Sequence, residues 1–330
     1  MGYSGVARHI LFVAVLMVPL AMPPGLAMEP TKAEQQSRAS AAGDKAAGPL
    51  ALQILLDRAA FSPGEIDGIA GANLRRAIEA FRQARQLRAG DTSALETALG
   101  ASDTPLLVDY VITPEDAAGP FLPEVPADPA GQAVLPALSY TSVLELLGER
   151  FHSSPDLLRK LNPTAAFVVG ETLHVPNVVT KPSSPQRGSG AAVSVARLVQ
   201  VSRAASGLTV YDSEHRVIFF APVTSGSEHD PLPLGRWTVT AVVRNPPFNY
   251  NPELFWDADT ATKIKLPPGP NGPVGTVWID LSKPHYGLHG TPEPGHVGHT
   301  TSHGCVRLTN WDAETVAGLV RKGTAVRFVR

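Results

Sequence analysis

The chain of 330 residues contains a single cysteine, Cys305, and this scarcity limits what its thiol can do. One cysteine cannot form an internal disulfide, so no disulfide framework supports the fold. In an exported protein, an unpaired cysteine indicates either an intermolecular disulfide or a free reactive thiol. The sequence therefore leaves two main interpretations of Cys305, a buried thiol without a function or a nucleophile.

Charged residues are also scarce, at 18% of the chain, and the net charge is only −2. Nucleic-acid-binding proteins carry a basic patch or stripe, so we expect no nucleic acid as a partner. Proline and glycine are frequent instead, with 31 and 29 residues. This composition favours a loop-rich protein built of short strands over a helical bundle.

The sequence has no apolar run that would span a bilayer comfortably. Residues 10–22 form the longest run near the N-terminus, and these 13 residues fall short of the roughly 20 that a transmembrane helix needs. Arg8 and His9 precede this run and small residues at 25–27 follow it, a pattern typical of a secretory signal. We therefore expect a signal peptide at 1–27 and an exported mature chain that is not integral to the membrane; an uncleaved N-terminal anchor is the alternative.

Changes in composition divide the rest of the chain into segments. Apolar residues at helical spacing and short apolar runs between turn signals distinguish helical segments from strand-rich ones. In order, we expect a flexible spacer at 28–48, a helical domain at 49–100, a connector at 101–138, a small βααβ module at 139–178, a linker at 179–192 and a mostly antiparallel β domain at 193–330. The predicted fold class is therefore multi-domain α+β.

Two of these segments resemble known small modules. Residues 49–100 contain a helix, an Ile-Asp-Gly loop and a second helix that begins at an Asn73 cap. In this arrangement they resemble the peptidoglycan-binding-like domain of three small helices. Residues 139–178 resemble the lysin-motif (LysM) module, a glycan-binding unit, although Tyr140, Thr141 and Ser142 replace its usual Gly-Asp-Thr. The resemblances imply glycan as a partner, and a purely structural role is the alternative for both modules.

Five of the ten histidines lie in residues 285–303, immediately before the cysteine. Zinc is one chemistry that would use such a cluster, because histidine and cysteine are its usual ligands. However, neither CxxC nor HExxH occurs, and Pro284 and Gly287 disfavour the helix that would bring His285 and His289 together. We therefore expect no metal.

The pair His303 and Cys305 favours nucleophilic chemistry instead. The thiolate is the reactive form of cysteine, so the thiol needs a neighbour that lowers its pKa or takes its proton. Side chains two residues apart on an extended segment lie on the same side, and Gly304 between them permits an unusual backbone angle and a close approach of substrate. Acyl-transfer enzymes use such Cys–His pairs.

Three stretches together resemble the catalytic domain of the L,D-transpeptidases: SHGC at 302–305 with HGT at 289–291, LPLGRWTV at 232–239, and PPGPNGPVGTVWIDLS at 267–282. The resemblance covers nearly all of residues 195–330 and implies a β-sandwich-like domain in the periplasm or cell wall. It also implies acyl transfer on peptidoglycan stem tetrapeptides, with a thioester on the cysteine, release of D-Ala, 3→3 cross-links, inactivation by carbapenems, and no metal or organic cofactor.

The resemblance assigns a role to each residue near the thiol. Cys305 would be the nucleophile and His303 its base, while His289 would position the substrate or a water. The amides of Gly304 and Cys305 would form an oxyanion hole for the tetrahedral intermediate. Ser302 would shape the turn.

Arg307, Tyr286 and Gly290 are expected to bind substrate at the same cleft. The planar guanidinium of Arg307 suits a substrate carboxylate. A surface ion pair of Arg307 with Asp312 or Glu314 is the structural alternative.

The sequence leaves the acyl acceptor open. An amine of a second stem peptide would give a cross-link, a lysine amine would attach a lipoprotein, and a free D-amino acid would be exchanged. Water would make the protein an L,D-carboxypeptidase or a cross-link hydrolase. A cell-wall adhesion protein with an inert C-terminal domain is the alternative from another class, and the intact Ser-His-Gly-Cys motif argues against it.

Overall fold

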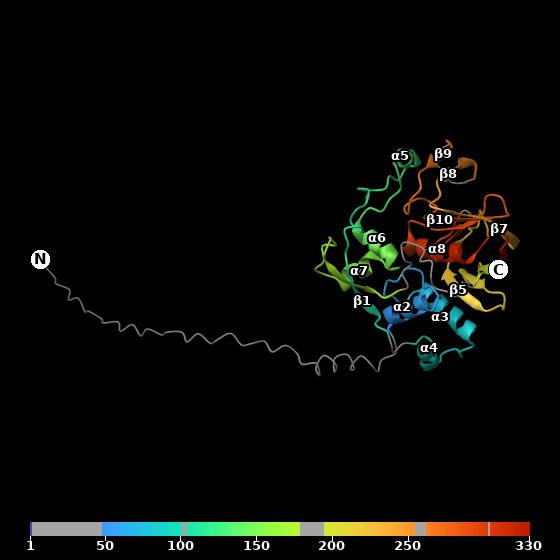
Figure 1. Cartoon of the computed structure of the whole chain (residues 1–330), viewed down its shortest axis with the longest axis horizontal. Coiled ribbons are helices and arrows are strands. Elements are labelled where there is room, and N and C mark those ends of the chain that lie inside the picture. The colour runs from blue at the N-terminus through green and yellow to red at the C-terminus, as the bar shows by residue number, and fades with distance from the viewer. Residues whose placement is uncertain (2–47, 101–103, 179–194, 255–261, 303) are drawn as a thin grey trace. The chain divides into compact units, whose positions relative to one another are not determined.

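The computed structural model describes Met1 and residues 48–100, 104–178, 195–254, 262–302 and 304–330 (Figure 1). The chain divides into a unit of residues 1–45 and a compact unit of residues 46–330, which contains every element discussed below. The expected signal at 1–27, nearly all of the spacer, the linker at 179–192 and His303 lie outside the described residues. Within the described ranges, no helix has the length and apolarity to cross a membrane.

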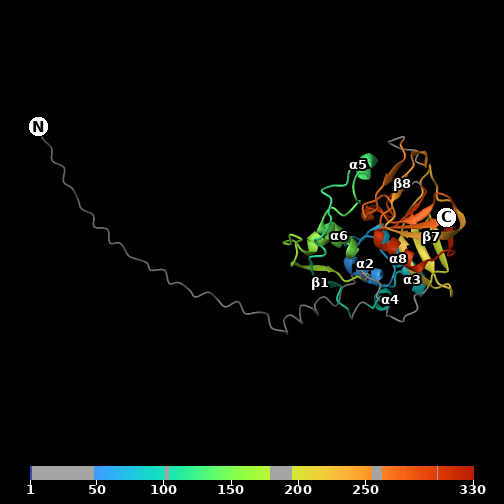
Figure 2. The same cartoon turned by 45° about the horizontal axis from the view of Figure 1, so that its top comes forward.

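The first elements of the compact unit are the helices α2 (Pro49–Arg58), α3 (Ala72–Arg85) and α4 (Thr92–Ala98) (Figure 2). Their apolar residues recur at helical spacing and form a buried cluster that includes Leu56, Phe81 and Leu95. The sequence predicted that Asn73 caps the second of these helices, and this is wrong. Gly71 is the N-cap, and the side-chain amide of Asn73 donates to the carbonyl of Val297, outside its own helix.

The next elements form a two-stranded sheet with two principal helices. Serine hydroxyls cap both of these helices: Ser142 accepts from the amide of Glu145, and Ser154 accepts from that of Leu157. The strand that pairs with the end of this segment lies in residues 101–138, the expected connector. In chain order the elements are β1 (Leu107–Val111), α5 (Pro129–Ala133), α6 (Val143–Arg150), α7 (Pro155–Leu161) and β2 (Thr172–Pro176).

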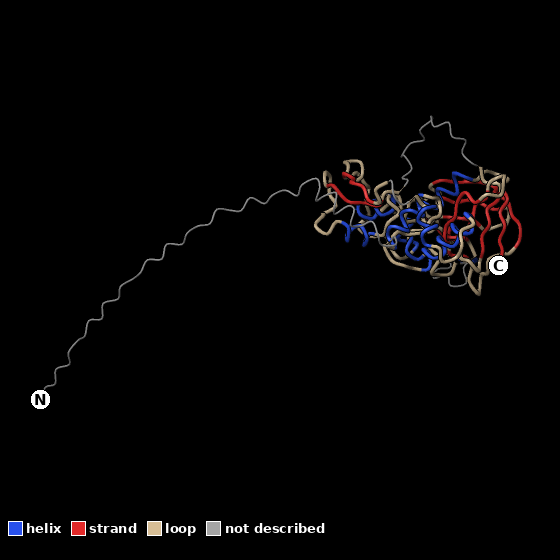
Figure 3. Tube along the Cα trace, turned by 90° about the horizontal axis from the view of Figure 1, so that it is seen from below, coloured by secondary structure: helices blue, strands red, loops and turns tan. Residues whose placement is uncertain are grey.

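The C-terminal part of the chain builds a nine-stranded sheet in the order β5-β4-β3-β13-β7-β10-β11-β12-β6, counted over the described residues (strands red in Figure 3). Most neighbours are antiparallel; β13 with β3 and β11 with β12 are parallel. The strands are β3 (Leu198–Ser202), β4 (Gly207–Tyr211), β5 (Val217–Pro222), β6 (Thr224–Ser225), β7 (Gly235–Arg244), β10 (Val277–Leu281), β11 (Gly287–His289), β12 (Val306–Arg307) and β13 (Ala325–Val329). A separate hairpin joins β8 (Phe248–Tyr250) to β9 (Ile264–Leu266).

The long strand β7 joins the two halves of this sheet. Its beginning pairs with β13, and its remainder, from Val239 to Arg244, pairs with β10. The structure is thus mixed α/β around one large, mostly antiparallel sheet. The expected β-sandwich-like domain would have two separate sheets; the described strands instead form one sheet, whose two halves share β7.

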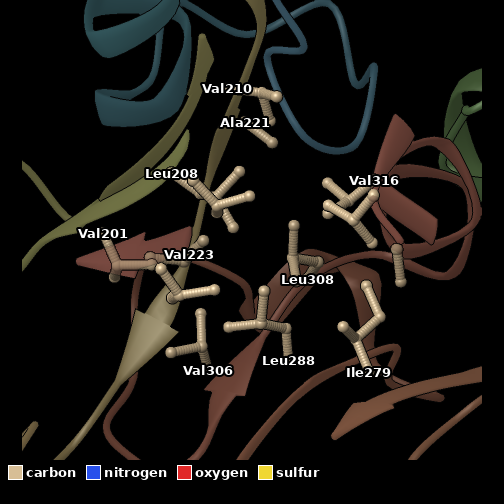
Figure 4. Packing of buried hydrophobic residues seen from close by; sticks show 14 of the residues in the cluster. Val201, Leu208, Val210, Ala221, Val223, Ile279, Leu288, Val306, Leu308 and Val316 are labelled. Atoms are coloured by element: carbon tan, nitrogen blue, oxygen red, sulfur yellow. The ribbon is translucent and has the colours of Figure 1, made fainter. Parts of the chain in front are cut away.

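The halves of the sheet and the helix α8 (Asn310–Leu319) enclose one hydrophobic core (Figure 4). Alternate residues of each strand point into it, as the period of two in the sequence predicts. Leu288 and Val306, both fully buried, lie opposite each other in β11 and β12. Each such side chain contributes about 1.5–3 kcal/mol by burial. The core therefore fixes the two strands that flank the candidate site.

The N-terminal helices pack directly on this sheet. Phe220 of β5 belongs to the helical cluster. Its backbone pairs with the segment that follows α2: the amide of Ser62 donates to the carbonyl of Phe220 at 2.8 Å, and the amide of Phe220 donates to the carbonyl of Ala60 at 3.0 Å. The hydroxyl of Ser62 also donates to the buried carboxylate of Asp312 at 2.9 Å. The helices and the sheet therefore share a core and a buried polar contact.

Candidate active site

Cys305 lies immediately before β12, beside the segment that leads into the parallel strand β11. Its thiol donates to the carbonyl of His285 over 3.6 Å, and the backbone of Gly287 also hydrogen bonds to it. The residue is half-buried. The pairing of β11 with β12 therefore places the thiol against residues that lie about twenty positions earlier in the chain.

Burial raises the pKa of the Cys305 thiol above its usual value. The hydrogen bond from Gly287 and the positive charge of Arg307 oppose this effect without cancelling it. The thiol is therefore neutral near pH 7, where a free thiol is already mostly protonated. A nucleophilic role for this sulfur requires a base that takes the proton during the attack.

The buried Ser302 holds the turn that precedes the cysteine. Its hydroxyl donates to the carbonyl of Cys305 at 2.6 Å and accepts from the amide of Gly226 at 2.7 Å. Its own amide donates to the carbonyl of Gly226 at 3.2 Å. The serine thus ties the turn to the residue that follows β6.

Gly304 has a conformation that favours glycine, with φ at +95°. A Cβ atom at this position would lie 2.8 Å from Cε1 of Tyr286. Tyr286 therefore lies directly against the turn, and burial, followed by the negative charge of Asp230, raises the pKa of its phenol. The sequence-predicted residues Gly304, Tyr286 and Cys305 do come together.

His289 lies in β11 and is only 4% exposed. Its ring stacks on Trp278, the residue opposite it in β10, with centroids 5.5 Å apart. Nδ1 lies 2.7 Å from the carbonyl of Gly290. A carbonyl can only accept, so Nδ1 carries the proton and Nε2 presents a lone pair.

Burial, followed by the charge of Arg307, lowers the pKa of His289 to about 4. The imidazole is therefore neutral at physiological pH and can accept a hydrogen bond or a proton through Nε2. Arg307 lies beside it, since the two residues are partners in the β11–β12 register. Asp312 and Glu314 were the acids considered as ion-pair partners of Arg307. Glu314 forms an ion pair with Arg244, and Asp312 accepts a hydrogen bond from Ser62.

The remaining predicted residues lie in different environments. Gly290 packs against α8, where a Cβ would lie 2.1 Å from Oδ1 of Asn310. His285 and His296 are exposed, and His296 pairs with Glu293 at 3.2 Å. In the described part of the chain, no three His, Cys, Asp or Glu side chains are placed to hold a metal ion.

Sequence reasoning did not single out Lys283. Its ammonium lies 4.6 Å from the ring centroid of Tyr286 and 5.5 Å from that of Trp237. Both are cation–π distances, which place a positive charge beside the tyrosine that covers the turn. The signal available in the sequence was the position of this lysine, three residues before Tyr286.

Comparison with known families identifies the domain that carries this site. Residues 196–328 match the model of the YkuD family, described as the L,D-transpeptidase catalytic domain. A Bacillus licheniformis protein that carries the name L,D-transpeptidase YkuD is 44% identical over 63 residues, which are 19% of this chain and 38% of that protein. The protein of the same name from Bacillus subtilis is 27% identical over 189 residues, 57% of this chain and 93% of its own length.

Among solved structures, L,D-transpeptidase 3 from Mycobacterium tuberculosis, in complex with a faropenem-derived adduct, is 19% identical. The match covers 40% of this chain and 60% of that one, with a TM-score of 0.34. The alignments to this structure and to the Bacillus licheniformis protein thus each span less than two thirds of the relative. By the match to the family model and to these curated relatives, residues 196–328 are similar to the YkuD L,D-transpeptidase catalytic domain.

Proposed function

We propose that this protein is an exported, cysteine-dependent L,D-transpeptidase that acts on peptidoglycan stem tetrapeptides. The observation that carries the proposal is the half-buried thiol of Cys305 on a turn held by Ser302 and covered by Tyr286. This turn lies within the residues that match the L,D-transpeptidase catalytic-domain family model. The expected glycan binding by residues 139–178 and the domain boundaries stay predictions.

In the first half of the proposed reaction, Cys305 attacks the carbonyl between the L-centre of diaminopimelate and the terminal D-Ala. Since burial keeps the thiol protonated, a base must take its proton, and we assign this role to His303, two residues away in the sequence. The amides of Gly304 and Cys305 donate to the oxyanion. Collapse of the tetrahedral intermediate breaks the peptide bond, His303 returns the proton to the leaving amine, and D-Ala departs from a thioester.

In the second half, an acceptor amine attacks the thioester carbonyl and regenerates the thiol. The neutral His289 is suited to this step because the lone pair on Nε2 can hold the acceptor amine or take its proton. A diaminopimelate amine from a second stem peptide gives a 3→3 cross-link. Nucleophile, base and oxyanion donors complete the scheme, which therefore uses no metal or organic cofactor.

Positive charge at the site favours an anionic substrate. Arg307 stabilises the thiolate form of Cys305 and can also pair with a stem-peptide carboxylate. Lys283, held over the ring of Tyr286, adds a second cation. We assign both residues, together with Tyr286, to binding of the donor peptide.

The proposal is tested by incubating the purified protein with a disaccharide tetrapeptide and analysing products and intact protein by mass spectrometry. Release of D-Ala and an acyl adduct on Cys305 are expected, and Cys305→Ala should abolish both. A dimeric product identifies cross-linking, whereas a tripeptide product identifies hydrolysis by the same acyl-enzyme. Folded protein that gives neither turnover nor an adduct, with this substrate or with a carbapenem, would contradict the assignment.

A further inference from the structure

The loop between His289 and Ser302 leaves the sheet and contacts the first turn of α3. Nδ2 of Asn73 donates to the carbonyl of Val297 at 2.8 Å, across 224 positions of sequence. Nη1 of Arg76 donates to the carbonyl of Gly298 at 3.1 Å and to Oδ1 of Asn73 at 2.6 Å. The N-terminal helices thus supply the donors for two consecutive carbonyl groups of this loop.

These contacts are not a by-product of helix capping. The N-cap of α3 is Gly71, and the side chain of Asn73 makes no capping bond. Asn73 is nevertheless 9% exposed, so its amide is removed from water. A buried amide requires partners, and Asn73 finds them in Val297 and Arg76.

The fit between loop and helix is close. Val297 is 1% exposed, and Gly298 has φ at +79°. A Cβ on Gly298 would lie 2.4 Å from Oδ1 of Asn73. On the other side, the amide of Gly298 donates to Oγ1 of Thr224 in β6 at 2.9 Å. The loop is therefore held between α3 and the edge strand that pairs with β12.

The same loop runs directly into the turn that carries the thiol. Ser302, which bonds to both Gly226 and Cys305, follows Gly298 by four positions. Because the loop is short, a displacement of Val297 and Gly298 must be absorbed within these few residues. These residues end at Ser302, whose hydroxyl donates to the carbonyl of Cys305.

The helix can act as a fixed support because it is attached to the sheet independently of this loop. Phe220 packs in the helical cluster, and Ser62 bonds to Asp312 in the buried start of α8. Neither contact involves the loop at residues 292–301. Loss of the loop contacts would therefore leave the helices in place.

We propose that Asn73 and Arg76 are positioning residues that hold the loop at residues 292–301 and, through it, the turn of Cys305. The N-terminal helices then have a role in catalysis as well as any role in contacting the wall. The effect on turnover rests on the proposed transpeptidase function. The effect on loop order and on thiol reactivity does not depend on it.

The most informative variant is Asn73→Asp. It keeps the shape of the side chain and the acceptor used by Arg76, but it replaces the donor to Val297 with a carboxylate oxygen that repels the carbonyl. A negative charge in the first turn of a helix is favourable, so α3 itself is not weakened. Arg76→Ala removes the second contact, and Arg76→Lys should restore part of it. Arg75→Ala is the matched control, because this exposed neighbour donates to Ala70 instead.

Three measurements apply to each full-length variant: amide hydrogen exchange of residues 296–300, the rate of Cys305 alkylation by iodoacetamide across pH, and kcat and KM with the tetrapeptide. In Asn73→Asp and Arg76→Ala we expect exchange in this loop to accelerate about tenfold. The dependence of the Cys305 alkylation rate on pH should shift. We also expect kcat to fall about tenfold with KM little changed, because misplaced reacting groups slow the chemical step. The hydrogen-exchange rates of the core amides of Leu288 and Val306 should equal those in the control variant Arg75→Ala.

Unchanged loop exchange in both folded variants would overturn the proposal, as would faster exchange with unaltered alkylation and kcat. If the parent protein shows no turnover at all, the proposed function fails, while exchange and alkylation still decide the positioning role. If Asn73→Asp does not fold, Arg76→Ala and Arg76→Lys provide the same comparison at a half-buried position.

Discussion

At the scale of single residues, the geometry of the site depends on positions where neighbouring groups leave no room for a different side chain. Gly304 combines a positive φ with the ring of Tyr286 at contact distance. Ser302 uses its one hydroxyl both to donate and to accept, which joins the turn to Gly226. His289 is kept neutral by burial and oriented by the adjacent carbonyl. Small substitutions at these positions should change chemistry more than stability.

For Gly304→Ala we expect a loss of about 100-fold in the rate of Cys305 acylation, because the turn must move to relieve the clash with Tyr286. The positive φ adds a destabilisation of about 1–2 kcal/mol. Acylation is followed by intact mass and stability by urea unfolding. Gly318→Ala is the control, since this helical glycine has nothing within 4 Å of an added Cβ. A double variant with Tyr286→Ala should recover part of the rate; full activity of Gly304→Ala alone would contradict the described geometry.

For His289 the lowered pKa predicts a specific pH dependence. With its pKa at about 4, the imidazole stays neutral between pH 5 and 9 and cannot set an acidic limb of kcat/KM near pH 6. His289→Gln should therefore lower the rate but leave the apparent pKa of that limb unchanged. Histidine NMR measures the titration directly, and a midpoint near 6.5 for His289 would show that the ring is not desolvated as described.

At the scale of secondary-structure elements, packing between the N-terminal helices and the sheet determines how the chain holds together. Phe220 projects from β5 into the cluster formed by α2 and α3, beside Phe61 and Phe81. Phe61, which follows α2, and Phe81 of α3 meet edge to face at 5.1 Å between centroids. The helices thus obtain part of their hydrophobic core from the sheet.

Phe220→Ala should lower the free energy of unfolding by about 3–5 kcal/mol, as large-to-small changes of buried aromatics do. Because the residue joins two elements, we expect the helices and the sheet to lose stability together. Circular dichroism and the fluorescence of tryptophans in the sheet should report one shared transition at a lower urea concentration. Phe220→Leu, which keeps most of the volume, should cost clearly less. Separate transitions in the parent protein would show that the helices fold independently.

At the scale of the whole molecule, one buried and two half-buried carboxyl groups lie where the parts of the compact unit meet: Asp312 is buried, and Glu149 and Glu65 are half-buried. Burial is the largest cause that raises the pKa of Glu149 to about 8 and those of Glu65 and Asp312 to about 7. Glu149 accepts a hydrogen bond from Asn310, while Glu145, Glu65 and Asp312 add negative charge around it. In the folded protein these groups keep their protons at pH values where the unfolded chain has lost them.

These shifts predict that stability decreases as the pH rises. Between about pH 4.5 and 8 the folded state binds more protons than the unfolded state, so the carboxyl contribution to the free energy of unfolding falls through this range. Glu149→Gln should remove part of the slope and raise stability at pH 8 by about 1–3 kcal/mol, with little change at pH 4.5. Urea unfolding across pH measures this, with the exposed Glu115→Gln as control. Parallel pH profiles for Glu149→Gln and the parent would refute the burial of this charge.

The sequence by itself determined the chemistry-bearing motif and most secondary-structure elements. Alternation in the strands, serine caps and the SHGC motif are local patterns, and short-range sterics and hydrogen bonding suffice to read them. Only the tertiary structure decided which distant groups meet: Asn73 with Val297, Tyr286 with Gly304, and β1 with a strand some 65 positions later. Such contacts follow from packing between elements, and no periodicity in the chain encodes them. The same holds for the pKa of His289, which is set by the depth at which β11 is buried.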